Sequence, residues 1–334
     1  MSGTTTRIAG LDVLRGVAIG LVMLRHAFPA PFAGAGVVGV VMFFALSGYL
    51  ITGLLIGELG RTGRVDLRRF YVRRARRLVP ALVVLVACVV VVTLALDPLG
   101  DRAELGKTVL VALTWTGNLP FGYASDATFH LWTLATEEQF YLFWPAVLAF
   151  AFTRRRVGSS LVLAAVLCLT ACLATVLWLW EDPDLAYALP TSWALCFVVG
   201  AAARLFQDRL RVPPYVVPLA LAGLAVLSVV PLRGHALTYL AGGPAIAALT
   251  AVLLLSWRTW TDVSAPALRG LCWLGTVSYG AYLWNYPLTL WLHPSLGGVA
   301  GPVAATLTLV AAAASWHLVE RRWQARPVRE PAPA

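Results

Sequence analysis

The stretch LDVLRGVAIGLVMLRHAFPAPF, Leu11–Phe32, has the length and apolar character of a helix that crosses a lipid bilayer. Arg15 and His26 interrupt it, and ionisable residues inside a membrane span are costly and usually functional. Eleven positions separate them, so a helix carries both on nearly the same face, about 16 Å apart along its axis. Such a stripe can hold an anionic ligand at Arg15 and perform acid–base chemistry at His26. The alternative is a buried arginine and histidine that pair with neighbouring carbonyl groups.

Composition places the whole chain in the membrane class. Of its 334 residues, 59% are hydrophobic and only 13% are charged, a balance that excludes an ordinary soluble domain. The net charge of +10 comes almost entirely from arginine, with Lys107 as the single lysine. No basic run is combined with a nucleic-acid-binding module, so we expect no nucleic-acid partner. The five cysteines show no metal-ligand spacing, so we expect no metal site.

Apolar segments long enough to span a bilayer predict an all-α integral membrane protein, a bundle of about ten transmembrane helices. The ten segments are 11–31, 36–57, 78–97, 131–152, 160–180, 190–206, 214–231, 239–256, 271–292 and 302–319. Segment 105–117 is apolar but shorter, and we interpret it as one re-entrant or interfacial segment.

The distribution of arginine predicts the orientation, because loops on the cytoplasmic side carry an excess of basic residues. With the N-terminus inside, the basic groups 61–77 and 154–156 fall in inner loops and the acidic runs 97–104 and 181–184 in outer loops. If 105–117 spanned the bilayer, the group 154–156 would lie outside. We therefore predict a multi-pass protein of the cell (plasma) membrane with both termini cytoplasmic, and a disordered tail at 326–334.

The densest basic group is Arg61–Arg77, which holds eight arginines in seventeen residues. One interpretation is a loop that contacts anionic lipid headgroups. The other is an arginine cluster at the inner mouth of the bundle that binds a phosphorylated cytosolic ligand through bidentate contacts. Composition alone leaves both interpretations open.

Polar residues also enter the fourth and ninth predicted spans. In HLWTLATEEQFY, His130–Tyr141, the adjacent Glu137 and Glu138 point about 100° apart on a helix, so one can face the bundle. The alternative is a solvated carboxylate pair at the outer boundary. In SYGAYLWNYP, Ser278–Pro287, a polar stripe is followed by a proline that frees a backbone carbonyl. Such a stripe more often lines a cavity than the membrane interface.

Together these segments resemble the membrane acyltransferase-3 family of integral-membrane O-acyltransferases that modify sugars. The matching segments, in family order, are LDVLRG at 11–16 with His26, FFALSGYL at 43–50, RLVP at 77–80, LWTLATEEQFYL at 131–142, SYGAYLW at 278–284 and VER at 319–321. The resemblance covers nearly the whole chain and defines a membrane acyltransferase domain at 1–325. Asn285 departs from it, since many members have histidine there.

The resemblance implies transfer of an acyl group, most often acetyl, from acyl-CoA to a hydroxyl of a sugar-containing acceptor. We expect acyl-CoA as a co-substrate, with no permanently bound cofactor. The acceptor could be a polysaccharide unit, a lipid-linked sugar or the sugar of a secondary metabolite. The alternatives are a transporter or flippase for an anionic solute, which would use the same cavity without an acyl donor, and a non-catalytic membrane scaffold.

The candidate residues have three expected roles. His26, Arg15 and Glu137 are the catalytic candidates, with His26 as general base or acyl carrier and Glu137 orienting the acceptor or His26. The CoA phosphates are expected on Arg69, Arg73, Arg74 and Arg77. The acceptor or the developing oxyanion is expected on Ser47, Asn118, Tyr141, Tyr282 and Asn285.

Overall fold

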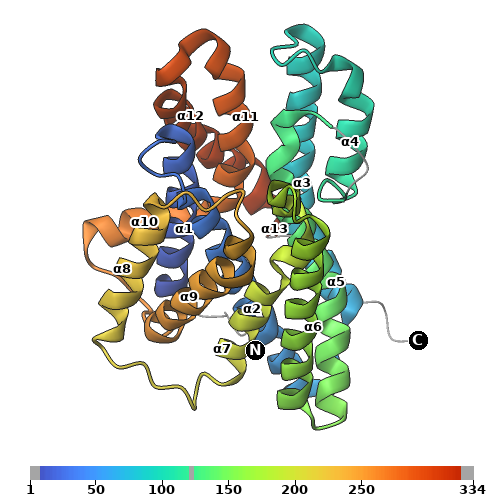
Figure 1. The fold of residues 1–334 in the computed structure, drawn as a ribbon, viewed down its shortest axis with the longest axis vertical. Coiled ribbons are helices and arrows are strands. Elements are labelled where there is room, and N and C mark those ends of the chain that lie inside the picture. The colour runs from blue at the N-terminus through green and yellow to red at the C-terminus, as the bar shows by residue number, and fades with distance from the viewer. Residues whose placement is uncertain (1–7, 120–123, 325–334) are drawn as a thin grey trace.

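Helices make up all the regular structure in the residues that the computed structural model describes, 8–119 and 124–324 (Figure 1). The helices are α1 Ala9–Ala27, α2 Ala35–Thr62, α3 Leu67–Ala95, α4 Leu105–Leu113, α5 Trp132–Thr153, α6 Val157–Trp178, α7 Ala194–Leu205, α8 Val216–Val229, α9 Gly243–Trp257, α10 Pro266–Thr276, α11 Ser278–Leu296, α12 Ala300–Ser315 and α13 Arg321–Gln324. Short 3₁₀ turns at Asp126–Leu131 and Pro183–Ala188 join some of them. The predicted tail at 326–334 lies outside the described residues.

A helix occupies each of the ten predicted spans, and the all-α prediction is confirmed. Among the described residues, five helical stretches are long and apolar enough to cross a membrane. They are Ala35–Thr62, Leu67–Ala95, Val157–Trp178, Thr238–Trp257 and Ser278–Gln324, the last of which contains several elements. α4 has nine residues, about 14 Å of helix and less than half of a bilayer core. The count of ten spans and the re-entrant segment stay predictions.

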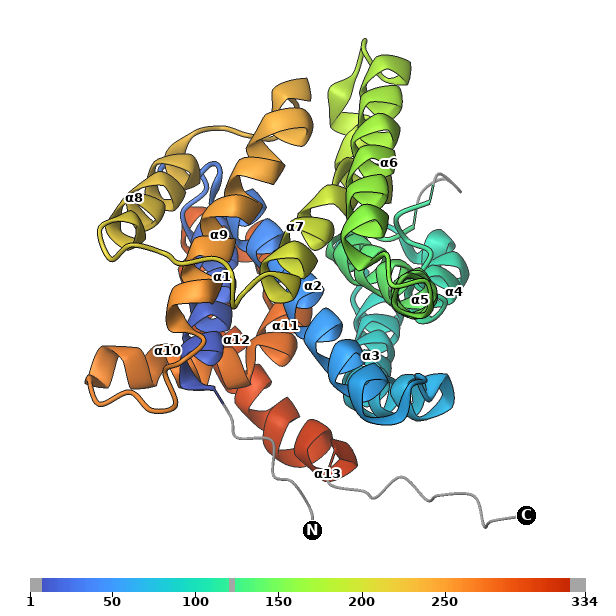
Figure 2. The same ribbon diagram turned by 90° about the horizontal axis from the view of Figure 1, so that it is seen from below.

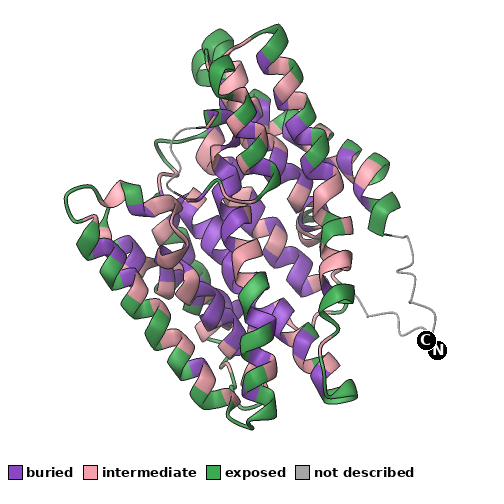
Figure 3. Cartoon of the chain, turned by 90° about the vertical axis from the view of Figure 1, so that its right-hand side faces the viewer, coloured by how far each residue is buried: buried purple, intermediate pink, exposed green. Residues whose placement is uncertain are grey.

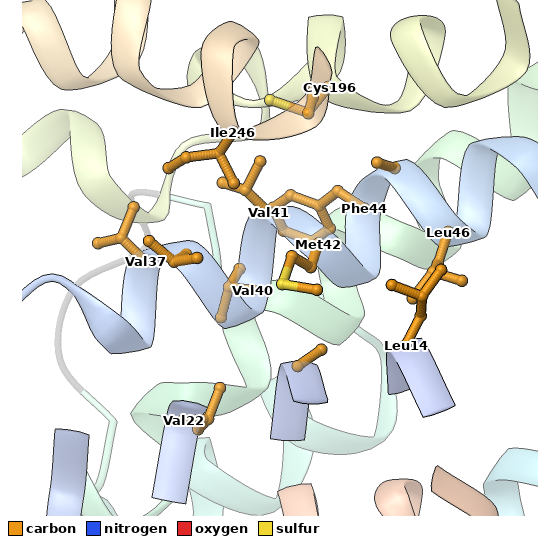
Figure 4. Packing of buried hydrophobic residues seen from close by; sticks show 14 of the residues in the cluster. Leu14, Val22, Val37, Val40, Val41, Met42, Phe44, Leu46, Cys196 and Ile246 are labelled. Carbon is orange, nitrogen blue, oxygen red and sulfur yellow. The ribbon is translucent and has the colours of Figure 1, made fainter. Parts of the chain in front are cut away.

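α2 is the central helix of the bundle and packs against α1, α5, α7, α8 and α9 (Figure 2). Its contact with α7 is very close, because a Cβ added at Gly48 would lie 2.0 Å from the carbonyl oxygen of Phe197. Gly200 of α7 meets Ala45 in the same way. Apolar side chains of α1, α2, α7 and α9 fill the core around this contact (Figure 4). The small residues at 47–48 therefore serve helix packing at Gly48.

The outward faces of the peripheral helices are apolar yet exposed (Figure 3). α6 illustrates this, since Val162, Val166 and Leu177 are each more than half exposed. α3 and α8 carry similar exposed aliphatic residues. Surfaces of this extent are rare on soluble monomers and are stable when lipid covers them. The protein is thus a multi-pass membrane protein.

The arginine-rich segment is helical over most of its length, so the expectation of a loop at 61–77 holds only for 63–66, between α2 and α3. Asp66 begins α3 as its N-cap, where its Oδ1 accepts a hydrogen bond from the Arg69 backbone N–H at 2.9 Å. Arginine has a high helix propensity, so nothing in 67–77 opposes continuation into the apolar part of the helix. α3 has 29 residues and is about 43 Å long, which extends it well beyond a bilayer core.

The ninth predicted span, 271–292, is broken at Val277 between α10 and α11. Gly275 seats α10 against α1, because a Cβ there would lie 1.9 Å from the carbonyl oxygen of Asp12. Tyr279 instead ties α11 to α3, since its hydroxyl donates to the carbonyl of Leu78 at 2.8 Å. The two halves are thus anchored to different helices. The break places Ser278 and Tyr279 in the first turn of α11.

The two described ends of the chain lie at the same end of the bundle, since Ile8 and Gln324 line one cavity. Figure 2 shows the start of α1 and α13 at this end and the α8–α9 connection at the other. His26 is in the last turn of α1, and so lies toward the opposite end from Ile8.

Candidate active site

A cavity of about 520 Å³ lies between α1, α2, α3, α5 and α11. Four arginines line it: Arg15 from α1, and Arg73, Arg74 and Arg77 from the first turns of α3. α5 contributes Glu137, the one acidic residue among those that line this cavity. A cavity with this excess of cations suits a ligand with several negative charges, and guanidinium groups match phosphate geometry.

Glu137 is fixed inside the cavity by two hydroxyl groups. The Ser47 hydroxyl donates to its Oε1 at 3.2 Å and the Tyr141 hydroxyl to its Oε2 at 3.4 Å. Tyr141 is one helical turn beyond Glu137 on α5, as the four-residue spacing predicts. The carboxylate is therefore held facing the arginines.

Glu138 has a different environment and is not among the residues that line the cavity. Its Oε1 accepts a hydrogen bond from Arg74 Nη2 at 3.1 Å, and each side chain of this ion pair is only 17% exposed. The guanidinium carbon of Arg74 also lies 3.4 Å from the centre of the Tyr141 ring. Glu138 thus fixes an arginine of the cavity wall. The interpretation of the Glu pair as a solvated outer boundary is wrong, since Glu138 pairs with Arg74 of α3 and Glu137 lines the arginine-rich cavity.

A second cavity of about 530 Å³ adjoins the first. The two share Arg15, Arg77, Ser278 and Tyr279 as lining residues. The second cavity also reaches Glu320, which is 2% exposed and accepts a hydrogen bond from the Ser315 hydroxyl at 2.8 Å. Because Ile8 and Gln324 line it as well, it extends from the shared wall to the end of the bundle where the described chain begins and stops.

His26 lies apart from both cavities and is paired with Asn285 of α11, Nδ1 to Oδ1 at 2.5 Å. The hydroxyl of Thr308 donates to the Ala304 carbonyl at 2.7 Å, so its oxygen can only accept from Asn285 Nδ2, 3.2 Å away. The amide oxygen of Asn285 therefore faces His26. Nδ1 of His26 must then carry the proton and donate it, which leaves a lone pair on Nε2.

A polar layer separates the first cavity from His26. Tyr282 and Thr133 line the cavity, their hydroxyl groups lie 2.6 Å apart, and the Tyr282 hydroxyl donates to the His130 carbonyl at 2.7 Å. Beyond them the rings of His130 and Tyr286 lie 5.3 Å apart, and Tyr286 lies 5.2 Å from His26. The layer connects the cavity with His26 through packed side chains.

Pro287 explains how His130 is held in this layer. A proline inside a helix cannot donate to the carbonyl four residues earlier, here that of Leu283. His130 Nε2 lies 3.2 Å from this carbonyl oxygen and takes the place of the missing donor. The freed carbonyl expected from the sequence is present and is used by a buried histidine.

Eight of the twelve predicted site residues line the first cavity. They are Arg15, Ser47, Arg73, Arg74, Arg77, Glu137, Tyr141 and Tyr282. His26 and Asn285 lie together beyond Tyr282. Arg69 is exposed on the first turn of α3, outside the residues that line either cavity. The roles of these residues stay predictions.

Asn118 is not among the residues that line either cavity, and its expected contact with an acceptor stays a prediction. It is 2% exposed, and its side-chain amide forms a reciprocal pair with that of Gln139, both bonds at 2.9 Å. It therefore anchors the segment before α5. Glu137 does not form a hydrogen bond with His26 in the structure. The side-chain partner of His26 is Asn285.

Glu320 and Thr308 are among the residues near the site that received no role from the sequence. Glu320 lies in the closing VER segment, where a carboxylate directly after the last apolar stretch was the available signal. Thr308, which orients Asn285, carries no such signal, because threonine is common in membrane helices.

The acyltransferase-3 family model, described as an acyltransferase domain, matches residues 8–319. The chain belongs to this family. It is 30% identical over 322 residues to the peptidoglycan O-acetyltransferase of Listeria monocytogenes, an alignment that covers 86% of this chain and 50% of that protein. It is 26% identical over 316 residues to an O-acetyltransferase of Staphylococcus aureus, covering 86% of this chain and 51% of that one. The chain thus spans about half the length of these relatives. No solved structure matches it.

Proposed function

We propose that this protein transfers an acyl group, acetyl in the first instance, from cytosolic acyl-CoA to a hydroxyl group of a sugar-containing acceptor. Membership of the acyltransferase family supports the reaction type, and the names of the relatives favour a glycan such as peptidoglycan as the acceptor. The use of acyl-CoA as the donor is supported by one observation, the cavity lined by Arg15, Arg73, Arg74 and Arg77.

The donor binds with its phosphates on these arginines. The second cavity reaches the shared wall from the end of the bundle that we assign to the cytoplasm, so acyl-CoA enters by this route. Its pantetheine arm then extends along the first cavity toward Tyr282. Glu137, held by Ser47 and Tyr141, orients the arm by accepting hydrogen bonds from its amide groups.

His26 performs the acid–base chemistry from the other side of the polar layer. Its Nε2 lone pair takes the proton of the acceptor hydroxyl while the oxygen attacks the thioester carbon, and the CoA thiolate leaves. Alternatively Nε2 attacks first and carries the acyl group to the acceptor. Asn285 and Thr308 hold the ring in the tautomer that both routes need. The thioester must pass Tyr282 and Thr133, so we expect this pair to move during turnover.

The decisive experiment measures release of free CoA from acetyl-CoA by the purified protein in lipid nanodiscs, with and without a glycan acceptor. We expect His26→Ala to abolish transfer at unchanged protein abundance. Transfer within threefold of wild type would remove His26 from the mechanism. A transporter would move an anionic solute across proteoliposomes without cleaving the thioester.

The same assay tests the donor site. Arg73→Ala and Arg77→Ala should raise the apparent KM for acetyl-CoA about tenfold, and the wild-type KM should itself rise with salt, because partly solvated charge contacts are screened. Arg69→Ala is the matched control, since Arg69 lies on the same helix outside both cavities. An unchanged KM in all three variants would instead support contact between this segment and anionic lipid.

A further inference from the structure

An ion pair with fixed geometry lies at the end of the bundle opposite to the two described chain ends. Arg233, in the α8–α9 connection, donates from Nε and Nη2 to Oδ1 and Oδ2 of Asp184 at 2.7 and 2.8 Å. The two side chains are 51% and 42% exposed, so solvent or a ligand can reach them. An exposed ion pair contributes little to stability by itself. Its two parallel bonds do define the orientation of both groups.

Aromatic rings hold this pair in place. The guanidinium carbon of Arg233 lies 4.7 Å from the centre of the Tyr187 ring and 5.7 Å from that of Phe129. These two rings are nearly parallel, at 15° and 6.4 Å. The rings and the pair come from three separate segments, Asp126–Leu131, Pro183–Ala188 and the α8–α9 connection. The result is a rigid polar group on an aromatic base.

The aromatic rings beneath the ion pair also continue to His26 through ring contacts. Phe129 packs against Tyr286 with ring centres 6.4 Å apart, and Tyr286 packs against His26 at 5.2 Å. Phe129 and Tyr286 are both partly exposed. A ligand on the Arg233–Asp184 pair would thus lie two aromatic rings from the imidazole.

We propose that Arg233, Asp184, Phe129 and Tyr286 form the binding site for a pyranose ring of the acceptor, an inference that rests on the proposed function. Arg233 has five N–H donors, of which Asp184 takes two, and the carboxylate keeps free lone pairs. Neighbouring sugar hydroxyls both donate and accept, so they can bond to the two groups side by side. The exposed parts of Phe129 and Tyr286 cover the apolar C–H face of the ring. Sugar and acyl donor thus reach His26 from opposite ends of the bundle.

The test uses the full chain in nanodiscs and a β-1,4-linked tetrasaccharide of N-acetylglucosamine as the probe. Binding is measured by calorimetry without any acyl donor, and CoA release is measured separately. Arg233→Ala and Asp184→Asn should each weaken tetrasaccharide binding at least tenfold and leave the KM for acetyl-CoA within twofold. Arg233→Lys keeps the charge but loses the bidentate geometry, so it should also weaken binding. Asp208→Asn is the matched control, since Asp208 forms another exposed ion pair, with Arg258.

Melting temperatures identify any variant that fails to fold. If Arg233→Ala does not fold, tetrasaccharide binding by the isosteric Asp184→Asn variant decides the test. Tetrasaccharide binding within twofold of wild type in folded Arg233→Ala and Asp184→Asn would overturn the site, as would a wild type that does not bind the sugar. A wild type that binds the sugar through Arg233 but never releases CoA would keep the site and overturn the proposed reaction.

Discussion

At the residue scale, the orientation of the His26 ring depends on two other side chains. Thr308 fixes the amide of Asn285, and Asn285 fixes the tautomer of His26. These contacts lead us to expect a positioning role for Asn285, and its predicted contact with the acceptor or the oxyanion stays a prediction.

Asn285→Leu should lower kcat about a hundredfold, because an unpaired imidazole can rotate or change tautomer. The KM for acetyl-CoA should stay the same, since Asn285 is not among the residues that line the donor cavity. Asn285→Asp keeps an acceptor oxygen and should recover much of the rate. A parallel rise in KM, or no recovery with aspartate, would contradict the positioning role.

The two neighbouring glutamates should respond differently to the same substitution. Glu137→Gln removes a charge from the cavity and should lower kcat at least tenfold. Glu138→Gln removes the partner of Arg74 and should mainly raise the KM for acetyl-CoA, by about three- to tenfold. Steady-state kinetics over a range of acetyl-CoA concentrations separates the two effects, and the reverse pattern would show that our assignment of the pair is wrong.

The sequence predicted those site residues whose partners follow from spacing along one helix. Glu137 and Tyr141 are one turn apart, and their contact is the outcome that the spacing favours. The pairing of His26 with Asn285 could not be predicted, because it depends on how α1 and α11 meet. Arg69 was grouped with Arg73 and Arg77 because a loop has no register, whereas the helix places it a turn before the cavity.

At the element scale, the fold depends on how closely α2 and α7 approach. Gly48→Val should separate the helices and lower the free energy of unfolding by about 3 kcal/mol, since its side chain would overlap the backbone at Phe197. Gly57→Val on the same helix serves as the control, since a Cβ added at Gly57 meets nothing within 4 Å. Thermal unfolding in detergent compares the two variants. Equal melting temperatures would mean that the α2–α7 contact tolerates expansion.

Hydrophobicity predicted that each apolar segment is a helix, but not where helices break or extend. The apolar pattern runs through Val277 without interruption, and only the separate anchoring of Gly275 and Tyr279 divides α10 from α11. In α3 the sequence instead missed a helix. The density of arginines indicated a loop, but the N-cap at Asp66 begins a helix there. Both differences arise from tertiary contacts and capping that composition does not record.

At the scale of the whole molecule, the predicted topology places the two ends of the bundle on opposite sides of the membrane. We expect cysteines introduced at Asp126 and Ser159, both exposed, to react with impermeant reagents from opposite sides. The background must lack the five native cysteines, which would otherwise react with the same reagents. Reaction from the same side would mean that 105–117 crosses the bilayer and that the predicted topology is wrong by one span.

The bond between His130 and the Leu283 carbonyl also constrains how this sequence can change over generations. A residue other than proline at 287 would restore the helical N–H, which would then compete with His130 for one oxygen atom. A buried histidine that loses this acceptor has an unsatisfied N–H group, which lowers stability. A proline without the histidine leaves the Leu283 carbonyl unsatisfied. Either single replacement is therefore harmful where the double replacement is tolerated, and positions 130 and 287 should be inherited as a pair.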